Sequence, residues 1–125
     1  MPRRVRPKAN TGRVLAATAM GYVLGSFPSA DLAGRLASRG VPRDLRAEGS
    51  GNPGALNAAQ VLGTRWGVAV LAADIGKGAA AGRLGRSIGG DLGAYSAATA
   101  AIAGHVAPPW SKFRGGKGIA TSAGA

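Results

Sequence analysis

Apolar residues along the chain gather into three long blocks that are separated by polar loops, and a fourth apolar block begins near the last residue. The first block runs from Val14 to about Leu36, the second covers 61–84, the third covers 92–106, and the fourth begins at Ile119. Helices that cross a bilayer need about 17–25 largely apolar residues. The pattern predicts an all-α fold, a polytopic transmembrane helical bundle with three complete apolar helices, the start of a fourth, and glycine-rich loops at the membrane interface.

Several residues inside the blocks predict how these helices bend and pack. The Gly21-x-x-x-Gly25 spacing lets two helices approach closely, and Pro28 should kink or end the first helix. Asp74 and Lys77 are three residues apart, so they share a helix face and can pair. A charge pair in an apolar helix is costly unless it faces a protein interior or a wet cavity.

The two ends of the chain differ in character. Residues 1–13 carry five positive charges and predict a disordered basic arm, followed by a membrane-embedded domain over 14–125. A secretory signal peptide is the alternative for the first segment, but no clean cleavage site precedes an exported domain. Because Ala125 lies inside an apolar run, we expect the domain to be incomplete at its C-terminus.

Charge and composition narrow the chemistry. Lys and Arg number 16 against 5 Asp and Glu, giving a net charge of +11, which favours anionic partners such as nucleic acid, lipid headgroups or phosphorylated substrates. With no Cys and one His, we expect no disulfide, no metal site and no cofactor. The five carboxylates are scattered, so no paired-carboxylate hydrolase chemistry is indicated.

The first candidate loop is Gly49-Ser50-Gly51-Asn52-Pro53-Gly54-Ala55. It contains G-x-G-x-x-G, but the dinucleotide fingerprint needs a preceding strand, and RDLRAE is not a buried strand. The glycines instead favour an anion-binding nest of backbone N–H groups. Asn52 would cap a following helix and Pro53 would occupy its first position, so that a phosphate sits at the helix N-terminus near Ser50 and Arg46. The alternative is a plain surface turn with a helix cap.

The second candidate loop is Phe113-Arg114-Gly115-Gly116-Lys117-Gly118, with hydroxyls at Thr121 and Ser122 one turn later. Three glycines around a lysine suggest a phosphate cradle, although the Walker A pattern is absent. The alternative is a basic interfacial loop that attracts anionic lipid. For Asp74 and Lys77 the residues alone favour an internal salt bridge over a ligand contact, and a lone His105 is more often structural than catalytic. Two phosphate-binding loops without an evident nucleophile suit a reaction that needs positioning and charge stabilisation.

Four ordered motifs carry a resemblance to a known family. They are Gly25-Ser26-Phe27-Pro28, the stretch from Asp44 to Asn57, Asp74 with Lys77-Gly78, and Gly104-His105 followed by Pro108 and Lys112 to Thr121. Their order and spacing resemble the bacterial acyl-phosphate:glycerol-3-phosphate acyltransferase (PlsY) family. The resemblance implies a multi-pass membrane enzyme of phospholipid biosynthesis in the inner (plasma) membrane. It would transfer a fatty acyl group from acyl phosphate to glycerol 3-phosphate and give lysophosphatidate, with its active-site loops cytoplasmic. The charges of the loops themselves set no orientation, because the two sides carry equal numbers of cations.

The resemblance also implies roles for individual residues. Ser50, Lys117 and His105 are the expected catalytic residues. The expected phosphate-binding residues are Arg46, Gly51, Asn52, Gly54, Asn57, Lys77, Gly115, Gly116, Gly118 and Thr121. The expected partners are acyl phosphate, glycerol 3-phosphate and the lipid bilayer, with no nucleic acid, no metal and no cofactor.

The sequence departs from the family pattern at two positions and lacks a third feature. Leu56 stands where the family usually has Thr, and Gln60 stands where it usually has Arg. The family's C-terminal motif, with a His and an Asn near the active site, would lie beyond Ala125. These departures keep two alternatives open: a non-catalytic or truncated relative that binds anionic lipid or a partner enzyme, and a soluble basic nucleic-acid binder, which high salt alone would release.

Overall fold

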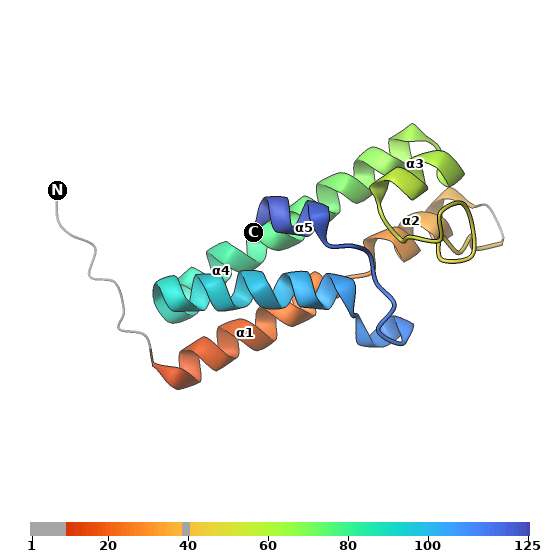
Figure 1. Cartoon of the computed structure of the whole chain (residues 1–125). Helices are drawn as coiled ribbons and strands as arrows, with labels where there is room; N and C mark the ends of the chain where they lie inside the picture. The colour runs from red at the N-terminus through yellow and green to blue at the C-terminus, as the bar shows by residue number, and fades with distance from the viewer. Residues whose placement is uncertain (1–9, 39–40) are drawn as a thin grey trace, which may run out of the picture.

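The computed structural model describes residues 10–38 and 41–125, and within these ranges every regular element is a helix. The elements are α1 (Thr11–Gly25), α2 (Ser29–Ala37), α3 (Ala55–Leu62), α4 (Thr64–Val106), the 3₁₀ turn η1 (Pro109–Ser111) and α5 (Ile119–Gly124). Figure 1 shows α1 and the two halves of α4 lying along one another, with the short α5 against α4. The predicted all-α class is therefore confirmed for the described part of the chain.

Helix α4 is a hairpin of two arms. The backbone leaves the helical region at Gly89 (φ −129°, ψ 20°) and Gly90 (φ 67°, ψ −154°), and the positive φ at Gly90 is one that glycine tolerates best. The predicted block at 61–84 thus begins with the last two residues of α3, Val61 and Leu62, and continues as the first arm of α4, and the block at 92–106 is the second arm. A Cβ at Gly85 would lie 2.5 Å from the carbonyl oxygen of Gly93, so glycines let the arms meet.

The first apolar block is two helices rather than one. Helix α1 ends at Gly25 and α2 begins at Ser29, because Pro28 has no N–H to continue the helix; the predicted break at Pro28 is confirmed. Helix α1 begins at Thr11, inside the segment expected to be disordered. Asn10 explains this start, since its side-chain oxygen accepts a 2.8 Å hydrogen bond from the Arg13 N–H, as an N-cap does. Residues 1–9 of the expected arm lie outside the described residues.

Small residues bring α1 against the second arm of α4. A Cβ at Gly21 would lie 2.7 Å from the Cα of Ala97, and one at Gly25 would lie 2.5 Å from the Cα of Ala101. Both distances are below any normal carbon–carbon contact, so the two backbones touch. The close contact predicted from Gly21-x-x-x-Gly25 is confirmed, and its partner is the second arm of α4.

We expect Gly25→Ala to lower the free energy of unfolding by about 1–3 kcal/mol, because the added methyl overlaps a backbone that cannot move alone. Gly82→Ala is the matched control: nothing lies within 4 Å of a Cβ at this helical position. It should raise stability by about 0.5–1 kcal/mol, since alanine is the better helix former. Thermal unfolding of the two variants measures the difference, and equal stabilities would contradict the packing described.

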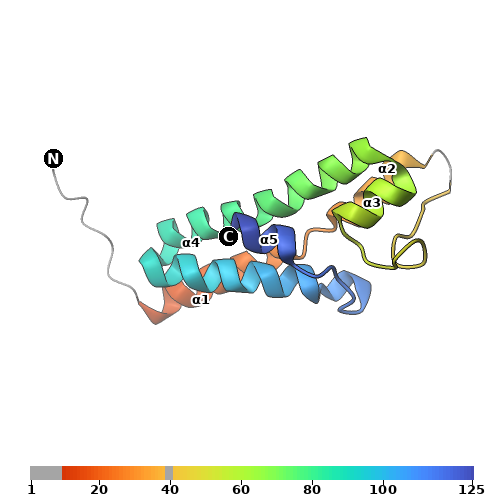
Figure 2. The same ribbon diagram turned by 45° about the horizontal axis from the view of Figure 1, so that its top comes forward.

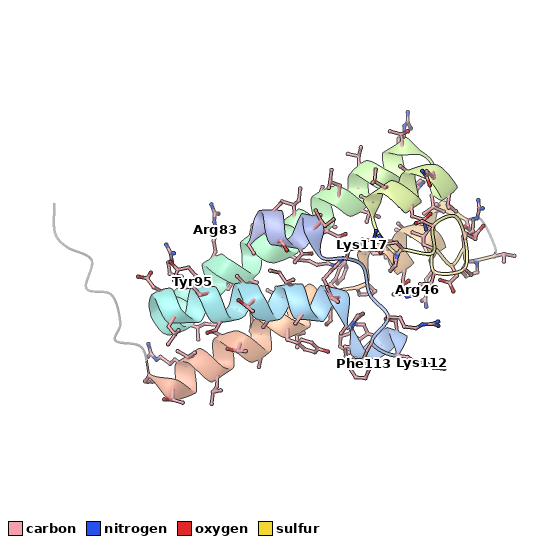
Figure 3. The ribbon with its side chains drawn as sticks, in the orientation of Figure 1. Arg46, Arg83, Tyr95, Lys112, Phe113 and Lys117 are labelled. Carbon is pink, nitrogen blue, oxygen red and sulfur yellow. The ribbon has the colours of Figure 1, made fainter. Side chains whose placement is uncertain are left out.

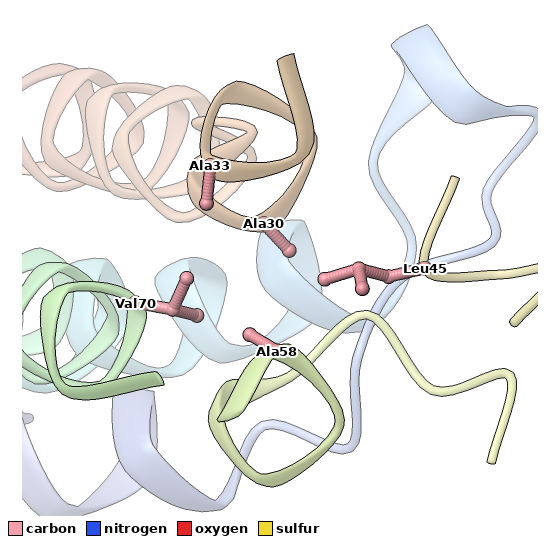
Figure 4. Close-up of a cluster of buried hydrophobic side chains, with 5 residues drawn as sticks. All are labelled: Ala30, Ala33, Leu45, Ala58 and Val70. Carbon is pink, nitrogen blue, oxygen red and sulfur yellow. The ribbon is translucent and has the colours of Figure 1, made fainter. Parts of the chain in front are cut away.

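The loops gather at one end of the bundle, together with α2 and α3 (Figures 1 and 2). A small apolar cluster fixes them there, and Figure 4 shows its members: Ala30 and Ala33 of α2, Leu45 of the loop, Ala58 of α3 and Val70 of α4. Leu45 is 1% exposed. The loop that carries the first glycine-rich motif is therefore anchored through Leu45 to three helices.

The prediction of complete membrane-crossing helices was compared with the length and hydropathy of each helix. Among the helices in residues 10–38 and 41–125, none reaches both the length and the mean hydropathy that a transmembrane span requires.

Candidate active site

The first glycine-rich loop is held in shape from the side by Asn57. The Asn57 carboxamide donates to the carbonyl oxygens of Leu45 (2.8 Å) and Glu48 (3.0 Å), and its oxygen accepts from the Ser50 N–H (3.1 Å). Asn57 is 2% exposed, and both of its N–H groups are used. It therefore orders the loop, and it has no donor left for the phosphate contact expected of it.

Two glycines allow the loop to fold this tightly. Gly49 and Gly51 have φ values of +55° and +76°, in the left-handed region that other residues rarely adopt. A Cβ at Gly49 would also collide with the Asn57 oxygen. On the outer side Arg43 donates to both oxygens of Glu48, and these hydrogen bonds lower the pKa of Glu48 below its usual value.

We expect Asn57→Ala to lower the free energy of unfolding by at least about 1–3 kcal/mol, because it leaves buried loop groups without a hydrogen-bond partner. Hydrogen exchange at the Ser50 amide should speed up in the same variant. Gln60→Ala, on the exposed face of the same helix, is the control and should stay within about 0.5 kcal/mol. An Asn57→Ala protein with unchanged stability and exchange would contradict this role.

The expected anion-binding nest within the loop is not formed. The N–H groups of Ser50, Gly51, Asn52 and Gly54 all bond to acceptors inside the loop or to Asn57. Asn52 is not the helix cap either, because α3 begins at Ala55 with Gly54 as its N-cap and no side-chain cap bond. The first turn of α3 therefore keeps free backbone N–H groups, which favour an anion.

The second loop is tied to the ends of α4 and α1. The Gly115 N–H donates to the Val106 carbonyl at 2.9 Å, and the Trp110 indole N–H donates to the Ser26 carbonyl at 2.6 Å. Lys112 and Phe113 have positive φ values of 54° and 61°, which non-glycine residues seldom adopt. These bonds and turns present Lys117 at the start of α5, between α4 and the chain that leads into α3 (Figure 3).

Both loops open into one cavity of about 490 Å³. Its polar lining includes seven expected site residues: Ser50, Asn52, Gly54, Asn57, His105, Lys117 and Gly118. Its apolar lining comes from α3, the first arm of α4 and α5: Ala55, Leu56, Leu71, Ile75, Ile119, Ala120 and Ala123. The cavity thus has a cation and a helix N-terminus at one part of its wall and a hydrophobic surface at another.

Lys117 is the available positive charge in this cavity. Its side chain is exposed, and across residues 10–38 and 41–125 no carboxylate forms an ion pair with it. An unpaired ammonium beside a helix N-terminus suits the binding of a phosphoryl group.

A buried charged cluster lies next to the cavity. Lys77 Nζ is 2.9 Å from Asp74 Oδ1 and 3.2 Å from His105 Nδ1, and the three residues are 8%, 2% and 9% exposed. Asp74 and His105 also line the cavity, whereas Lys77 does not. The internal salt bridge expected from the residues alone is present, and its ammonium has no direct access to a phosphate in the cavity.

Other expected phosphate-binding residues lie elsewhere. Arg46 forms an ion pair with Asp31 and donates to the Arg114 carbonyl at 2.7 Å, so it joins α2 to the second loop outside the cavity. Thr121 is fully buried against the first arm of α4 near Gly78. Gly115 and Gly116 pack on His105, and with Arg46 and Lys77 they line a separate space of about 20 Å³. Gly51 lines neither space.

The sequence pattern did not identify the apolar wall of the cavity. Leu71, Asp74 and Ile75 share one face of the first arm, and the i, i+3, i+4 spacing was available as an indication. Leu56 and Gln60, noted only as departures from a family pattern, also line the cavity on the exposed side of α3. Their side chains are four residues apart, so both border the space where a substrate would lie.

A family model described as glycerol-3-phosphate acyltransferase matches residues 15–125. The glycerol-3-phosphate acyltransferases of Bacillus velezensis and Bacillus subtilis are 46% and 44% identical over 105 residues, which cover 84% of this chain and 53% of theirs.

The solved structures that this chain resembles are also glycerol 3-phosphate acyltransferases. The crystal structure of PlsY, an integral membrane glycerol 3-phosphate acyltransferase in its glycerol 3-phosphate form, superposes with a TM-score of 0.77 at 35% identity, over 89% of this chain and 55% of that one. Its lysophosphatidic acid form gives 0.73 at 30% identity, over 87% and 53%. The chain spans about half the length of the curated relatives it matches. On the match over residues 15–125, this chain belongs to the glycerol-3-phosphate acyltransferase family.

Proposed function

We propose that the protein is a membrane acyltransferase that transfers a fatty acyl group from acyl phosphate to glycerol 3-phosphate and releases lysophosphatidate and inorganic phosphate. The observation that carries this proposal is the single cavity into which both glycine-rich loops open, with Lys117 in its polar part and an apolar wall beside it. A phosphorylated lipid precursor has the same two chemical parts. The matched relatives, which are glycerol-3-phosphate acyltransferases, support the acceptor.

The chemistry follows from these groups. The glycerol hydroxyl attacks the acyl carbon, the C–O bond to phosphate breaks, and the hydroxyl proton passes to the departing phosphate. Lys117 and the first turn of α3 stabilise the phosphoryl charge. Leu71, Ile75 and Ile119 contact the acyl chain and exclude water from the activated ester. Ser50 donates a hydrogen bond from its hydroxyl to the substrate phosphate, and His105 contacts the reacting acyl group.

The proposal places the protein in the inner membrane as a multi-pass protein with both loops on the cytoplasmic side, where soluble glycerol 3-phosphate is available. The solved relative that is described as an integral membrane enzyme supports the membrane location. We propose that the protein itself acts on these two phosphorylated substrates without nucleic acid, metal or cofactor.

The donor is tested by acyl transfer to radiolabelled glycerol 3-phosphate in membranes that express the protein. Acyl phosphate should support the reaction, and acyl-CoA at equal concentration should not. Lysophosphatidate formed from acyl-CoA alone would overturn the proposed donor. Absence of product from both donors, together with no binding of glycerol 3-phosphate to the purified protein, would overturn the enzyme.

A second candidate function, binding of anionic lipid without catalysis, has its own observation. A groove of about 410 Å³ on the outer side of the loops is lined by Arg35, Arg43, Arg46, Lys112 and Arg114 with only two carboxylates, Asp31 and Asp44. Arg43 and Arg46 are paired, and the other three cations are exposed. Such a groove attracts anionic headgroups.

The double variant Leu56→Thr with Gln60→Arg separates the two functions. Arg at position 60 would add a charge-assisted bond worth about 1.5–3 kcal/mol, so the KM for glycerol 3-phosphate should fall roughly 10–100-fold. Gln60→Lys tests whether charge alone suffices, since lysine lacks the planar guanidinium. Absence of acyl transfer both in the unaltered protein and in the double variant would favour the lipid-binding function.

A further inference from the structure

The cluster of Asp74, Lys77 and His105 has a chemical consequence for the only histidine of the chain. Asp74 and Lys77 lie on the first arm of α4 and His105 lies near the end of the second arm, so the hairpin brings them together. A histidine can act through either ring nitrogen, and its neighbours decide which one carries the proton.

Lys77 determines the state of His105 Nδ1. An ammonium group has three donors and no acceptor, and Lys77 Nζ lies 2.9 Å from Asp74 Oδ1 as the cation of a buried ion pair. Lys77 Nζ is 3.2 Å from His105 Nδ1, so in this contact Nδ1 is the acceptor. A neutral imidazole with an unprotonated Nδ1 carries its proton on Nε2.

The alternative state, with a proton on Nδ1, has no support in the geometry. The nearest carboxylate oxygen, Asp74 Oδ1, is 3.7 Å from Nδ1, which is too long for a hydrogen bond. An imidazolium would also direct an N–H at the Lys77 ammonium, and the two positive charges would repel in a buried site.

The opposite edge of the ring faces the second loop. A Cβ at Gly116 would collide with His105 Nε2 and lie 3.1 Å from Cε1, so the Nε2 edge of the ring lies against the backbone of the second loop at a position where only glycine fits. His105 also lines the large cavity beside Lys117 and Gly118. The N–H on Nε2 is therefore placed at the loop where the substrate's polar part is proposed to bind.

We propose that the Lys77–Asp74 pair holds His105 as the neutral Nε2–H tautomer, so that His105 acts at the cavity as a fixed hydrogen-bond donor and not as a general base. Its acceptor is the carbonyl oxygen of the acyl donor, which gains negative charge when the hydroxyl attacks. Lys77 and Asp74 are positioning residues in this arrangement. The identity of the acceptor rests on the proposed function, whereas the tautomer depends only on the contacts of His105.

The tautomer can be measured without substrate. Protein labelled with ¹⁵N in histidine gives one pair of ring-nitrogen signals, because the chain has one His. At neutral pH we expect a protonated Nε2 and an unprotonated Nδ1. A protonated Nδ1 in the unaltered protein, as the other tautomer or as imidazolium, would overturn the proposal.

Two variants test the role of Lys77. Lys77→Met should give a mixture of tautomers or a protonated ring, whereas Arg83→Met should leave the spectrum unchanged. Arg83 is an exposed cation on the same helix (Figure 3). A folded Lys77→Met protein with an unchanged spectrum would overturn the assignment to Lys77. If this variant does not fold, the spectrum of the unaltered protein still decides.

Activity tests the acceptor separately. His105→Ala should lower turnover about 10²–10³-fold, as loss of one oxyanion donor does. His105→Gln should retain more turnover than His105→Ala, because an amide N–H can replace the donor but cannot act as a base. Equal losses would overturn the donor role even if the tautomer is as expected. Absence of any turnover in the unaltered protein would instead contradict the proposed function and leave the tautomer standing.

Discussion

Lys117→Met is expected to lower kcat/KM for acyl transfer by about 10²–10³-fold, the effect of removing one preorganised charge-stabilising group. Methionine keeps the length and the apolar stem of lysine but removes the ammonium. The effect should be large because Lys117 lines the cavity and has no carboxylate partner among the described residues, so its charge is directed to the substrate.

The measurement is a set of initial rates with each substrate varied in turn. If Lys117 contacts the phosphate in both the ground state and the transition state, KM rises; if it acts on the departing phosphate only, kcat falls. Stability should change by less than about 0.5 kcal/mol, because an exposed, unpaired lysine contributes little to folding. This separates the prediction from a general loss of structure.

Arg65→Met is the matched control, since Arg65 is an exposed cation at the start of α4 and lies outside the cavity. It should leave the kinetics unchanged. A Lys117→Met protein with the kcat/KM of the unaltered protein would show that the loop lysine does not stabilise the reacting phosphate, and the proposed mechanism would then fail.

The positions of the two loops could be inferred from the sequence because glycine content and cations are local properties. The break at Pro28 and the contact at Gly21 and Gly25 were likewise local, since a missing N–H and a missing side chain act where they occur. These features follow from single residues and their immediate spacing.

Other features depended on contacts between distant segments. Helix α3 is only eight residues long and is embedded in a polar segment, so its apolar run was too short to stand out, and the helix N-terminus was assigned to Asn52 and Pro53 instead of Gly54 and Ala55. The partner of Arg46 is Asp31, 15 residues earlier, and no local pattern indicates that pair.

The site cluster shows the same division. The spacing of Asp74 and Lys77 predicted a pair on one helix face, and the pair is present. The addition of His105, 28 residues from Lys77, requires the turn at Gly89 and Gly90, where the apolar pattern predicts a loop between two separate helices. His105 could not be assigned to the cluster from sequence spacing, because it reaches Asp74 and Lys77 only when α4 folds back on itself.

Asp74→Asn is expected to lower the free energy of unfolding by about 3–5 kcal/mol, because it leaves the buried ammonium of Lys77 without an opposite charge. Denaturant unfolding followed by tryptophan fluorescence measures this value. Arg86→Met is the control. Arg86 and Asp91 form an exposed pair at 3.7 Å, with 63% and 45% of their side chains exposed, and such pairs contribute at most about 1 kcal/mol.

The double variant Asp74→Asn with Lys77→Met tests the reason for the loss. Removal of both charges leaves no uncompensated ion, so the double variant should be more stable than Asp74→Asn alone, and the two changes should be strongly non-additive. A double variant that is less stable than either single change would mean that the two residues stabilise the bundle independently. The same result would show that Asp74 and Lys77 do not act as one ion pair beside His105.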